Sequence, residues 1–132
     1  MEQHQKNAFA IAKWLQEQPR VQYVLYPGLE NHPGYEINKA QTTGFGGMIS
    51  FAVDNAETAR QILEGVKLIK FAESLGCTES LITYPIRQTH TDLTAEECAE
   101  KGITDCLLRF STGIEATQDL IDDLAQAFAA IE

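Results

Sequence analysis

Residues 106–115, CLLRFSTGIE, decide the fold, because this β-rich run carries one arginine between apolar neighbours and then stops at a glycine. In an extended strand, successive side chains point to opposite faces. Alternation therefore places Leu107, Arg109 and Ser111 on one face. The other face holds Cys106, Leu108, Phe110 and Thr112. The stretch predicts a strand with one mostly apolar face and one face that carries a guanidinium.

Arg109 has two interpretations. A guanidinium on a rigid strand suits two-pronged binding of a carboxylate or phosphate, because its donors form a planar fork. The plainer interpretation is a surface arginine that pairs with an acidic side chain, and residue statistics alone favour it. The choice depends on the rest of the chain.

The length of 132 residues fits one domain that can bury a core of its own. The apolar content of 44% is typical of a globular protein, and no apolar run is long enough to span a membrane. The first residues, MEQHQKN, are polar, so we expect no secretory leader and a cytoplasmic location. The net charge of -9 would repel a phosphate backbone, so nucleic acid is not an expected partner.

The cysteines and histidines are scattered along the chain. Cys77, Cys98 and Cys106 are odd in number and form no Cys-x-x-Cys pair, which favours reduced thiols that act as small apolar fillers. His4, His32 and His90 share no helical spacing with one another or with a cysteine. The sequence therefore predicts no metal site.

Hydrophobic periodicity and turn residues predict an alternation of helices and strands. The first helix covers residues 8–15 and lacks a capping residue among residues 1–5, which indicates a fragment whose helix continues from earlier sequence. Thr94 and Glu97 have capping-box spacing, and Thr117 is the expected cap of the last helix. Expected strands are 21–26, 48–53, 67–72, 80–84 and the run around Arg109; expected helices are 8–15, 35–39, 56–64, 94–101 and the segment after Thr117.

From residue 48 to residue 111 the predicted order is β-α-β-β-α-β, flanked by helices. This order predicts an α+β fold, a small α/β sandwich whose mostly antiparallel sheet is covered by helices. Three loops could carry chemistry: GFGG at 44–47, AESLGC at 72–77 and RQTH at 87–90. Each has a plainer interpretation, as a strand-entry turn, a plain connection and a polar loop respectively.

Several stretches together resemble one family, the pyridoxal-phosphate (PLP) enzymes of cysteine and methionine metabolism, which include cystathionine γ-synthases, γ-lyases and β-lyases and methionine γ-lyases. The stretches are YPGLENHPGYEINKAQ, GFGGMISFAV, KLIKFAESLG, ESLITYPIRQTH and GITDCLLRFSTGIEATQDLIDDL. They follow the family's order across nearly the whole chain. The resemblance is to the C-terminal domain, which in that family is a small α/β sandwich packed against a large PLP-binding domain.

The resemblance implies roles for four residues. Arg109 matches the arginine that binds the substrate's α-carboxylate, and Ser74 matches a residue that lines the same site. Glu73 matches a position beside the substrate that varies with reaction preference, and Thr89 lies in a stretch that borders the pocket. A carboxylate clamp would hold an amino acid in one orientation, so the resemblance and the chemistry of Arg109 agree.

Two departures qualify the resemblance. Cys77 stands where the family has a second glycine, so the local backbone must differ if that position needs a positive φ. The chain also has no counterpart of the large domain, with its Schiff-base lysine, ring-stacking tyrosine and phosphate site. We therefore expect PLP as the cofactor of the full-length enzyme, no PLP bound by this chain alone, and an isolated chain without activity.

The leading hypothesis is a C-terminal substrate-binding domain, residues 1–132, of a PLP-dependent trans-sulfuration enzyme. Its expected partners are a sulfur amino acid, the large PLP domain and further subunits of a homo-oligomer. One alternative is a stand-alone regulatory module that uses Arg109 to bind an amino acid without catalysis. Another is a structural fragment that self-associates through an apolar docking surface. Synthases and lyases share these stretches, so the reaction is left open.

Overall fold

The computed structural model describes residues 1–131, and its centre is a five-stranded sheet in the order β1-β2-β5-β4-β3. The strands are β1 Val21–Leu25, β2 Met48–Val53, β3 Lys70–Phe71, β4 Leu81–Thr83 and β5 Leu107–Ser111. Neighbouring strands are antiparallel except for the β3 and β4 pair, which is parallel. The prediction of a mostly antiparallel sheet is confirmed, with the arginine strand β5 at its centre.

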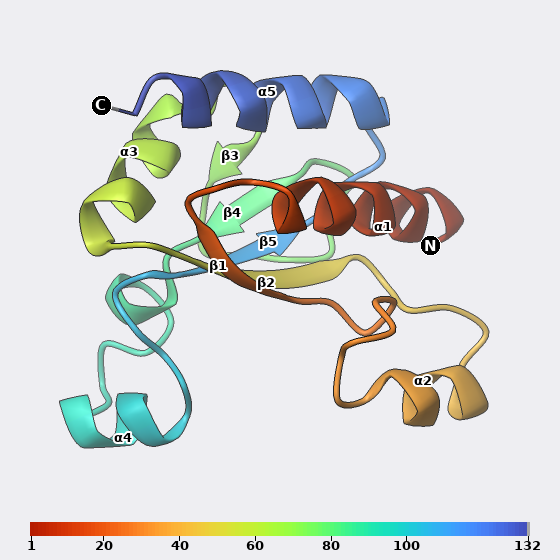
Figure 1. Cartoon of the computed structure of the whole chain (residues 1–132), viewed down its shortest axis with the longest axis horizontal. Helices are drawn as coiled ribbons and strands as arrows, with labels where there is room; N and C mark the ends of the chain where they lie inside the picture. Colours follow the sequence, from red (N-terminus) through yellow and green to blue (C-terminus); the bar gives the residue numbers. More distant parts are fainter. Residues whose placement is uncertain (132) are drawn as a thin grey trace.

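The three longest helices form a layer on one face of this sheet. The helices of residues 1–131 are α1 Glu2–Gln16, α2 Tyr35–Gln41, α3 Ala56–Gly65, α4 Ala95–Glu100 and α5 Thr117–Ala129, with a 3₁₀ turn, η1, at Pro85–Arg87. Figure 1 shows α1, α3 and α5 gathered along the sheet, whereas the short helices α2 and α4 lie outside this layer. The first helix begins at Glu2, six residues before the predicted residue 8, and the cap position, Met1, makes no side-chain cap, as the sequence predicted.

The hydrophobic core lies between the sheet and this helical layer. Leu108 and Phe110 of β5 are fully buried there, together with Phe51 of β2 and Ile11 and Leu15 of α1. The predicted apolar face of the arginine strand is therefore confirmed. Leu107 and Arg109, on the opposite face, are half-buried.

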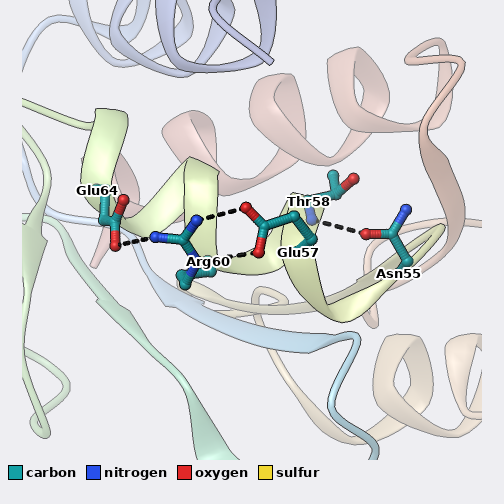
Figure 2. Close-up of polar contacts among 5 residues, drawn as sticks. All are labelled: Asn55, Glu57, Thr58, Arg60 and Glu64. Atoms are coloured by element: carbon teal, nitrogen blue, oxygen red, sulfur yellow. Dashed lines mark hydrogen bonds and ion pairs between the residues drawn. The ribbon is translucent and has the colours of Figure 1, made fainter. Parts of the chain in front are cut away.

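Helix α3 shows how local sequence begins and stabilises a helix (Figure 2). The Asn55 side chain accepts a hydrogen bond from the Thr58 amide at 2.9 Å, which satisfies one of the free N–H groups of the first turn. On the solvent side, the Arg60 guanidinium lies between the carboxylates of Glu57 and Glu64, one turn before and one turn after it. These exposed ion pairs keep the outer face of α3 polar.

Two helix starts differ in how well the sequence predicted them. The capping box of α4 is confirmed, because Thr94 accepts from the Glu97 amide and the Glu97 carboxylate accepts from the Thr94 amide. The prediction that Thr117 caps α5 is wrong, since Ala116 holds the cap position. Thr117 is instead the first residue of the helix, and its hydroxyl donates to Asn7 Oδ1 at 2.6 Å, which ties the start of α5 to α1.

The strand predicted at 67–72 is reduced to Lys70 and Phe71, and the cause is the buried carboxylate of Asp123. Asp123 Oδ2 accepts hydrogen bonds from the amides of Leu68 and Ile69 at 2.9 and 2.8 Å, and Asp123 Oδ1 accepts from the Lys67 amide at 2.9 Å. These amides are therefore not available for strand pairing. The predicted strand 80–84 is similarly shortened to Leu81–Thr83.

The remaining elements agree with the sequence analysis. Gly46 has a φ of +72° and leads directly into β2, so the GFGG loop is the strand-entry turn that was expected. Gly102 has a φ of +68° just after α4, as a helix-ending glycine should. No helix within residues 1–131 has the length and apolar character needed to cross a membrane.

Candidate functional site

The candidate site is built around a row of three polar residues on the face of the sheet opposite the core. Arg109 on β5 lies in register with Ser50 of β2 on one side and Thr83 of β4 on the other. Cross-strand partners in such a register point their side chains to the same face. Arg109 Nη2 donates a long hydrogen bond of 3.5 Å to Thr83 Oγ1.

The guanidinium of Arg109 is left incompletely satisfied by the chain. Its Nε is buried and has no hydrogen-bond partner within residues 1–131. The ion pairs of the described chain join Arg20 to Asp54 and Arg60 to two glutamates, and none involves Arg109. The plainer interpretation of Arg109, a surface arginine paired with an acid, is therefore wrong. An arginine that is half-buried without a counter-charge can bind an anion supplied by a ligand.

The loop at 72–77 lies beside this row because side chains from three elements hold it. Thr83 Oγ1 donates to the Ala72 carbonyl at 2.8 Å, and the Gly76 amide donates to Ser111 Oγ at 2.9 Å. His4 Nε2 contacts the Cys77 carbonyl at 3.2 Å. Thr83 is the register partner of Arg109, and Ser111 lies two residues further along β5. The loop is therefore fixed at Thr83, the neighbour of Arg109 in the row, and at Ser111 on the same strand as Arg109.

Three of the four predicted site residues belong to β5 and to the loop that is tied to β4 and β5. Glu73 and Ser74 are exposed and lie in this loop, between the anchored Ala72 and Gly76. Thr89 is placed differently. Its hydroxyl contacts the Pro85 carbonyl at 3.4 Å and His90 Nδ1 at 2.7 Å, both within its own turn, so no hydrogen bond joins Thr89 to the Arg109 row.

The backbone angles around Cys77 show whether this position needs the glycine that the family has there. Gly76 has a φ of +76°, whereas no residue other than glycine has a positive φ within residues 1–131. The left-handed position in the turn is therefore Gly76, and Cys77 fits the loop without strain. All three cysteines are free, but only Cys98 is a buried filler; the same prediction is wrong for Cys77 and Cys106, which are half-buried.

A polar junction supports the far end of the loop. The Glu115 carboxylate accepts from the Ser80 amide at 2.6 Å and from Ser80 Oγ at 2.9 Å, and Ser80 Oγ accepts from the Gly113 amide at 2.8 Å. Asn7 of α1 donates to the carbonyls of Gly113 and Glu115 at 3.0 and 2.9 Å. This junction fixes α1, the end of β5 and the segment before β4 relative to one another.

The RQTH loop borders a separate hollow between η1 and α4. Arg87 and His90 line it together with Tyr84, Cys98 and Asp105. Burial, and secondarily the charge of Asp105, raises the pKa of Tyr84, so its phenol stays neutral and donates to the Asp105 carbonyl at 2.6 Å. That hydrogen bond joins the segment before η1 to the loop that enters β5.

Sequence reasoning missed three residues that shape the site. Ser111 had been placed on the Arg109 face by alternation, but nothing indicated that it would bind the Gly76 amide. Nothing in the sequence indicated that Thr83 and His4 would hold this loop, because the groups they bind lie 11 and 73 residues away in the chain. Only the residue alternation in β4 could have placed Thr83 on a face.

The residues of this chain do not fit a complete PLP site. PLP is held in enzymes by a lysine amine that reacts with the cofactor aldehyde in an enclosed site. All six lysines within residues 1–131 are exposed, and the Lys70 amine donates to the Lys67 carbonyl at 3.1 Å. In the same part of the chain, no group of three His, Cys, Asp or Glu side chains could hold a metal ion.

Comparisons with known proteins agree on one family. Residues 1–129 match the sequence profile described as "Cys/Met metabolism PLP-dependent enzyme". A cystathionine gamma-lyase from Dictyostelium discoideum is 51% identical over 128 residues, which is 96% of this chain and 33% of that protein. A cystathionine gamma-synthase from Haemophilus influenzae is 48% identical over 132 residues, which is 100% of this chain and 31% of that protein.

The fold is similar to solved structures as well. The crystal structure of a cystathionine gamma-lyase from Lactobacillus plantarum, complexed with L-serine, has a TM-score of 0.92 and 40% identity, and the match covers 99% of this chain and 34% of that one. The chain thus spans about a third of the length of the relatives it matches. Lyases and a synthase match at similar identity, so similarity does not single out one reaction.

Proposed function

Because the chain belongs to the Cys/Met metabolism PLP-dependent enzyme family, we propose that it is the substrate-binding part of a longer PLP-dependent enzyme that acts on sulfur amino acids. In this proposal Arg109 binds the α-carboxylate of the substrate. The observation that carries it is the half-buried guanidinium on the central strand, with an unpartnered Nε and no acidic partner within residues 1–131.

A carboxylate is the ligand that this arrangement favours. Its two oxygens match two parallel N–H donors of a guanidinium, and the opposite charges make both hydrogen bonds short and strong. A strand in the middle of a sheet holds the arginine more rigidly than a loop does. Fixing one end of an amino acid in this way limits the orientations of the bond that reacts at its other end.

The other predicted residues have supporting roles in this proposal. Ser74 lines the carboxylate site, and the anchors at Thr83 and Ser111, which hold its loop to β4 and β5, the strands that pair at Arg109, support this role. Glu73, next to Ser74 and exposed, faces the part of the substrate that differs between reactions. Thr89 belongs, in this proposal, to a stretch that borders the pocket without contacting the clamp, since its own hydrogen bonds keep it within the turn after η1.

The PLP site belongs, in this proposal, to the two thirds of the relatives that the chain does not match. The exposed lysines of residues 1–131 support this division of labour. A purified sample of this chain mixed with PLP should accordingly give no strong visible absorbance band and no turnover. A strong band together with lyase activity from this chain alone would contradict the division.

A chimeric enzyme tests the role of Arg109 directly. This chain would replace the corresponding third of the Dictyostelium cystathionine gamma-lyase, to which it is 51% identical. We expect the chimera to cleave cystathionine, and Arg109→Lys to lower kcat/KM by about 10- to 100-fold, since a charge-assisted hydrogen bond contributes about 1.5–3 kcal/mol. The bound PLP absorbance should be unchanged, because Arg109 does not contact the cofactor in this proposal.

Arg60→Lys is the matched control, since Arg60 is exposed on the solvent side of α3, in the helical layer that covers the other face of the sheet. It should leave kcat/KM within about twofold, as exposed charges contribute little. Equal kinetics for Arg109→Lys and the parent chimera would reject the clamp. Tight binding of methionine by this chain alone, measured by calorimetry, would instead support a stand-alone regulatory module.

A further inference from the structure

We propose that His4 is a positioning residue that holds the 72–77 loop beside Arg109, an inference that rests on the proposed function. His4 lies in the first turn of α1, outside the sheet that carries Arg109. Its ring reaches across 73 positions of sequence to the Cys77 carbonyl, with 3.2 Å between Nε2 and the oxygen. It is the anchor of the loop that comes from the helical layer.

The partner of His4 decides which ring nitrogen carries the proton. A backbone carbonyl can only accept a hydrogen bond, so Nε2 must be the protonated nitrogen that donates to Cys77. In the neutral ring, Nδ1 is then left with a bare lone pair. The ring therefore acts here as a donor of defined direction.

The backbone around His4 is held firmly enough to make that direction specific. Thr112 Oγ1 donates to the His4 carbonyl at 2.9 Å. Gly47 lets α1 approach closely, because a Cβ placed at Gly47 would lie only 3.1 Å from His4 Cβ. One turn later, Asn7 is bound to the carbonyls of Gly113 and Glu115. The ring is thus carried on a fixed support at the end of β5.

The unpartnered Nδ1 of His4 argues that the contact with Cys77 has a purpose. Within residues 1–131, the buried side-chain nitrogen and oxygen atoms without a partner are His4 Nδ1 and Arg109 Nε. A buried acceptor without a donor costs free energy, and an apolar side chain of similar size would avoid that cost. Both residues are linked to the same loop, His4 directly at Cys77 and Arg109 through Thr83 at Ala72. The histidine is therefore explained by what Nε2 does for the loop.

The consequence for the site follows from where the three anchors stand. Thr83 holds the start of the loop at Ala72, and Ser111 holds Gly76. His4 holds Cys77, immediately after the only left-handed residue of the loop. Without this last anchor, the turn after Gly76 loses its connection to the helical layer, and the separation between Ser74 and Arg109 becomes variable. A carboxylate bound by both residues would then bind more weakly.

Two amide variants test whether the position of the N–H donor matters, because both carry the same amide group on side chains of different length. His4→Gln places an N–H group near the position of Nε2, whereas His4→Asn carries the same amide on a shorter arm, near the position of Nδ1. His4→Leu removes the donor and keeps the apolar bulk. His32→Leu is the control, because the His32 ring also bonds a backbone group, the Gly34 amide at 3.0 Å, but far from this loop in the chain.

Hydrogen exchange of the Gly76 amide in this chain is the test. We expect the exchange to become about three- to tenfold faster in His4→Leu and His4→Asn, which is the effect of losing one hydrogen bond of ordinary strength. His4→Gln and His32→Leu should exchange at the parent rate. Equal rates in all these proteins, or faster exchange in His4→Gln to the same extent as in His4→Asn, would overturn the inference.

The chimeric lyase supplies a second, independent measurement. His4→Asn should raise KM for the amino acid about three- to tenfold with kcat and the PLP absorbance retained, and His4→Gln should restore KM. A change in kcat with no change in KM would contradict a positioning role. If the parent chimera were inactive, the proposed function would fail, while hydrogen exchange in this chain would still decide whether His4 orders the loop.

Discussion

Thr83 and Arg109 are direct neighbours across β4 and β5, and one hydroxyl serves both the arginine and the loop beside it. Thr83 Oγ1 accepts from Arg109 Nη2 at 3.5 Å and donates its own proton to the Ala72 carbonyl at 2.8 Å. A hydroxyl has one donor and two acceptor positions, so these two contacts are compatible. Thr83 is buried, which excludes water as a substitute partner.

Replacing this hydroxyl tests the connection. Thr83→Val keeps the shape and removes the donor, so the Ala72 carbonyl loses its partner; we expect a loss of about 1–3 kcal/mol in the free energy of unfolding, measured in urea. KM of the chimeric lyase should rise as well, because the start of the loop is released. Thr83→Ser, which keeps the hydroxyl, should leave KM close to the parent value. A Val variant that matches the parent in both measurements would refute this connection.

Asp123 should be among the residues most sensitive to a loss of charge. Its carboxylate accepts from the amides of Lys67, Leu68 and Ile69, and hydrogen bonds to a charged group contribute about 1.5–3 kcal/mol in favourable cases. Asp123→Asn presents one oxygen and one NH₂ group to three N–H donors, so unfolding should become easier by about 2–3 kcal/mol. Chemical denaturation provides the measurement. The neighbouring Asp122→Asn, at an exposed position, should have little effect, and similar losses for both variants would contradict this account.

Gly113 should not tolerate even one additional carbon. A Cβ at this position would lie 2.2 Å from the Thr78 carbonyl oxygen, which itself accepts from the Ile114 amide at 2.8 Å. Gly113→Ala must therefore displace backbone, and we expect a thermal midpoint lower by roughly 10 °C or more, from a loss of about 3 kcal/mol. Gly34→Ala is the matched control, because its nearest contact would be 3.4 Å from a His32 side chain. A Gly113 variant as stable as the Gly34 variant would show that the segment can shift.

The raised pKa of Tyr26 predicts how the free energy of unfolding changes at alkaline pH. Burial raises its pKa from 10.0 to about 12, and its hydroxyl donates to the Gly46 carbonyl at 2.9 Å. Between these two values the folded chain keeps a phenolic proton that the unfolded chain releases, so this contribution to stability is complete below pH 10 and is lost as the pH rises towards 12. Tyr26→Phe should make the decline in stability over this range shallower.

A tyrosinate absorbance titration checks the same point in the native chain. Tyr26 should ionise about two pH units later than expected for an exposed phenol, and this late step should be absent from Tyr26→Phe, which leaves Tyr84 as the half-buried phenol with a raised pKa. Tyr23→Phe is the control, because Tyr23 is 40% exposed on β1. A late step that survives in Tyr26→Phe would assign it to another residue.

The sequence predicted the elements of this fold well wherever the signal is local. Alternation in β5 put Leu108 and Phe110 in the core and Arg109 on the opposite face, and the capping box located the start of α4. Each of these patterns depends on residues within a few positions of one another, which is the range over which strand and helix geometry acts.

The errors both involve residues whose hydrogen bonds go to distant partners. Thr117 is the first residue of α5 rather than its cap, and its hydroxyl donates to Asn7 of α1. The strand predicted at 67–72 is short, because Asp123 binds the amides that a longer strand would have paired. In both cases the structure has a tertiary hydrogen bond where the sequence pattern predicts a helix cap or a longer strand.

By itself, then, the sequence determined the β-α-β-β-α-β order, the two faces of the arginine strand and the resemblance to one enzyme family, because these depend on short-range periodicity and on the identity of consecutive residues. Only the tertiary structure decided what surrounds Arg109. The anchors Thr83, Ser111 and His4 come from β4, β5 and α1, and His4 lies 73 positions from the carbonyl it binds. Contacts between residues so far apart in the chain arise when the sheet packs against its helices, so local sequence patterns cannot predict them.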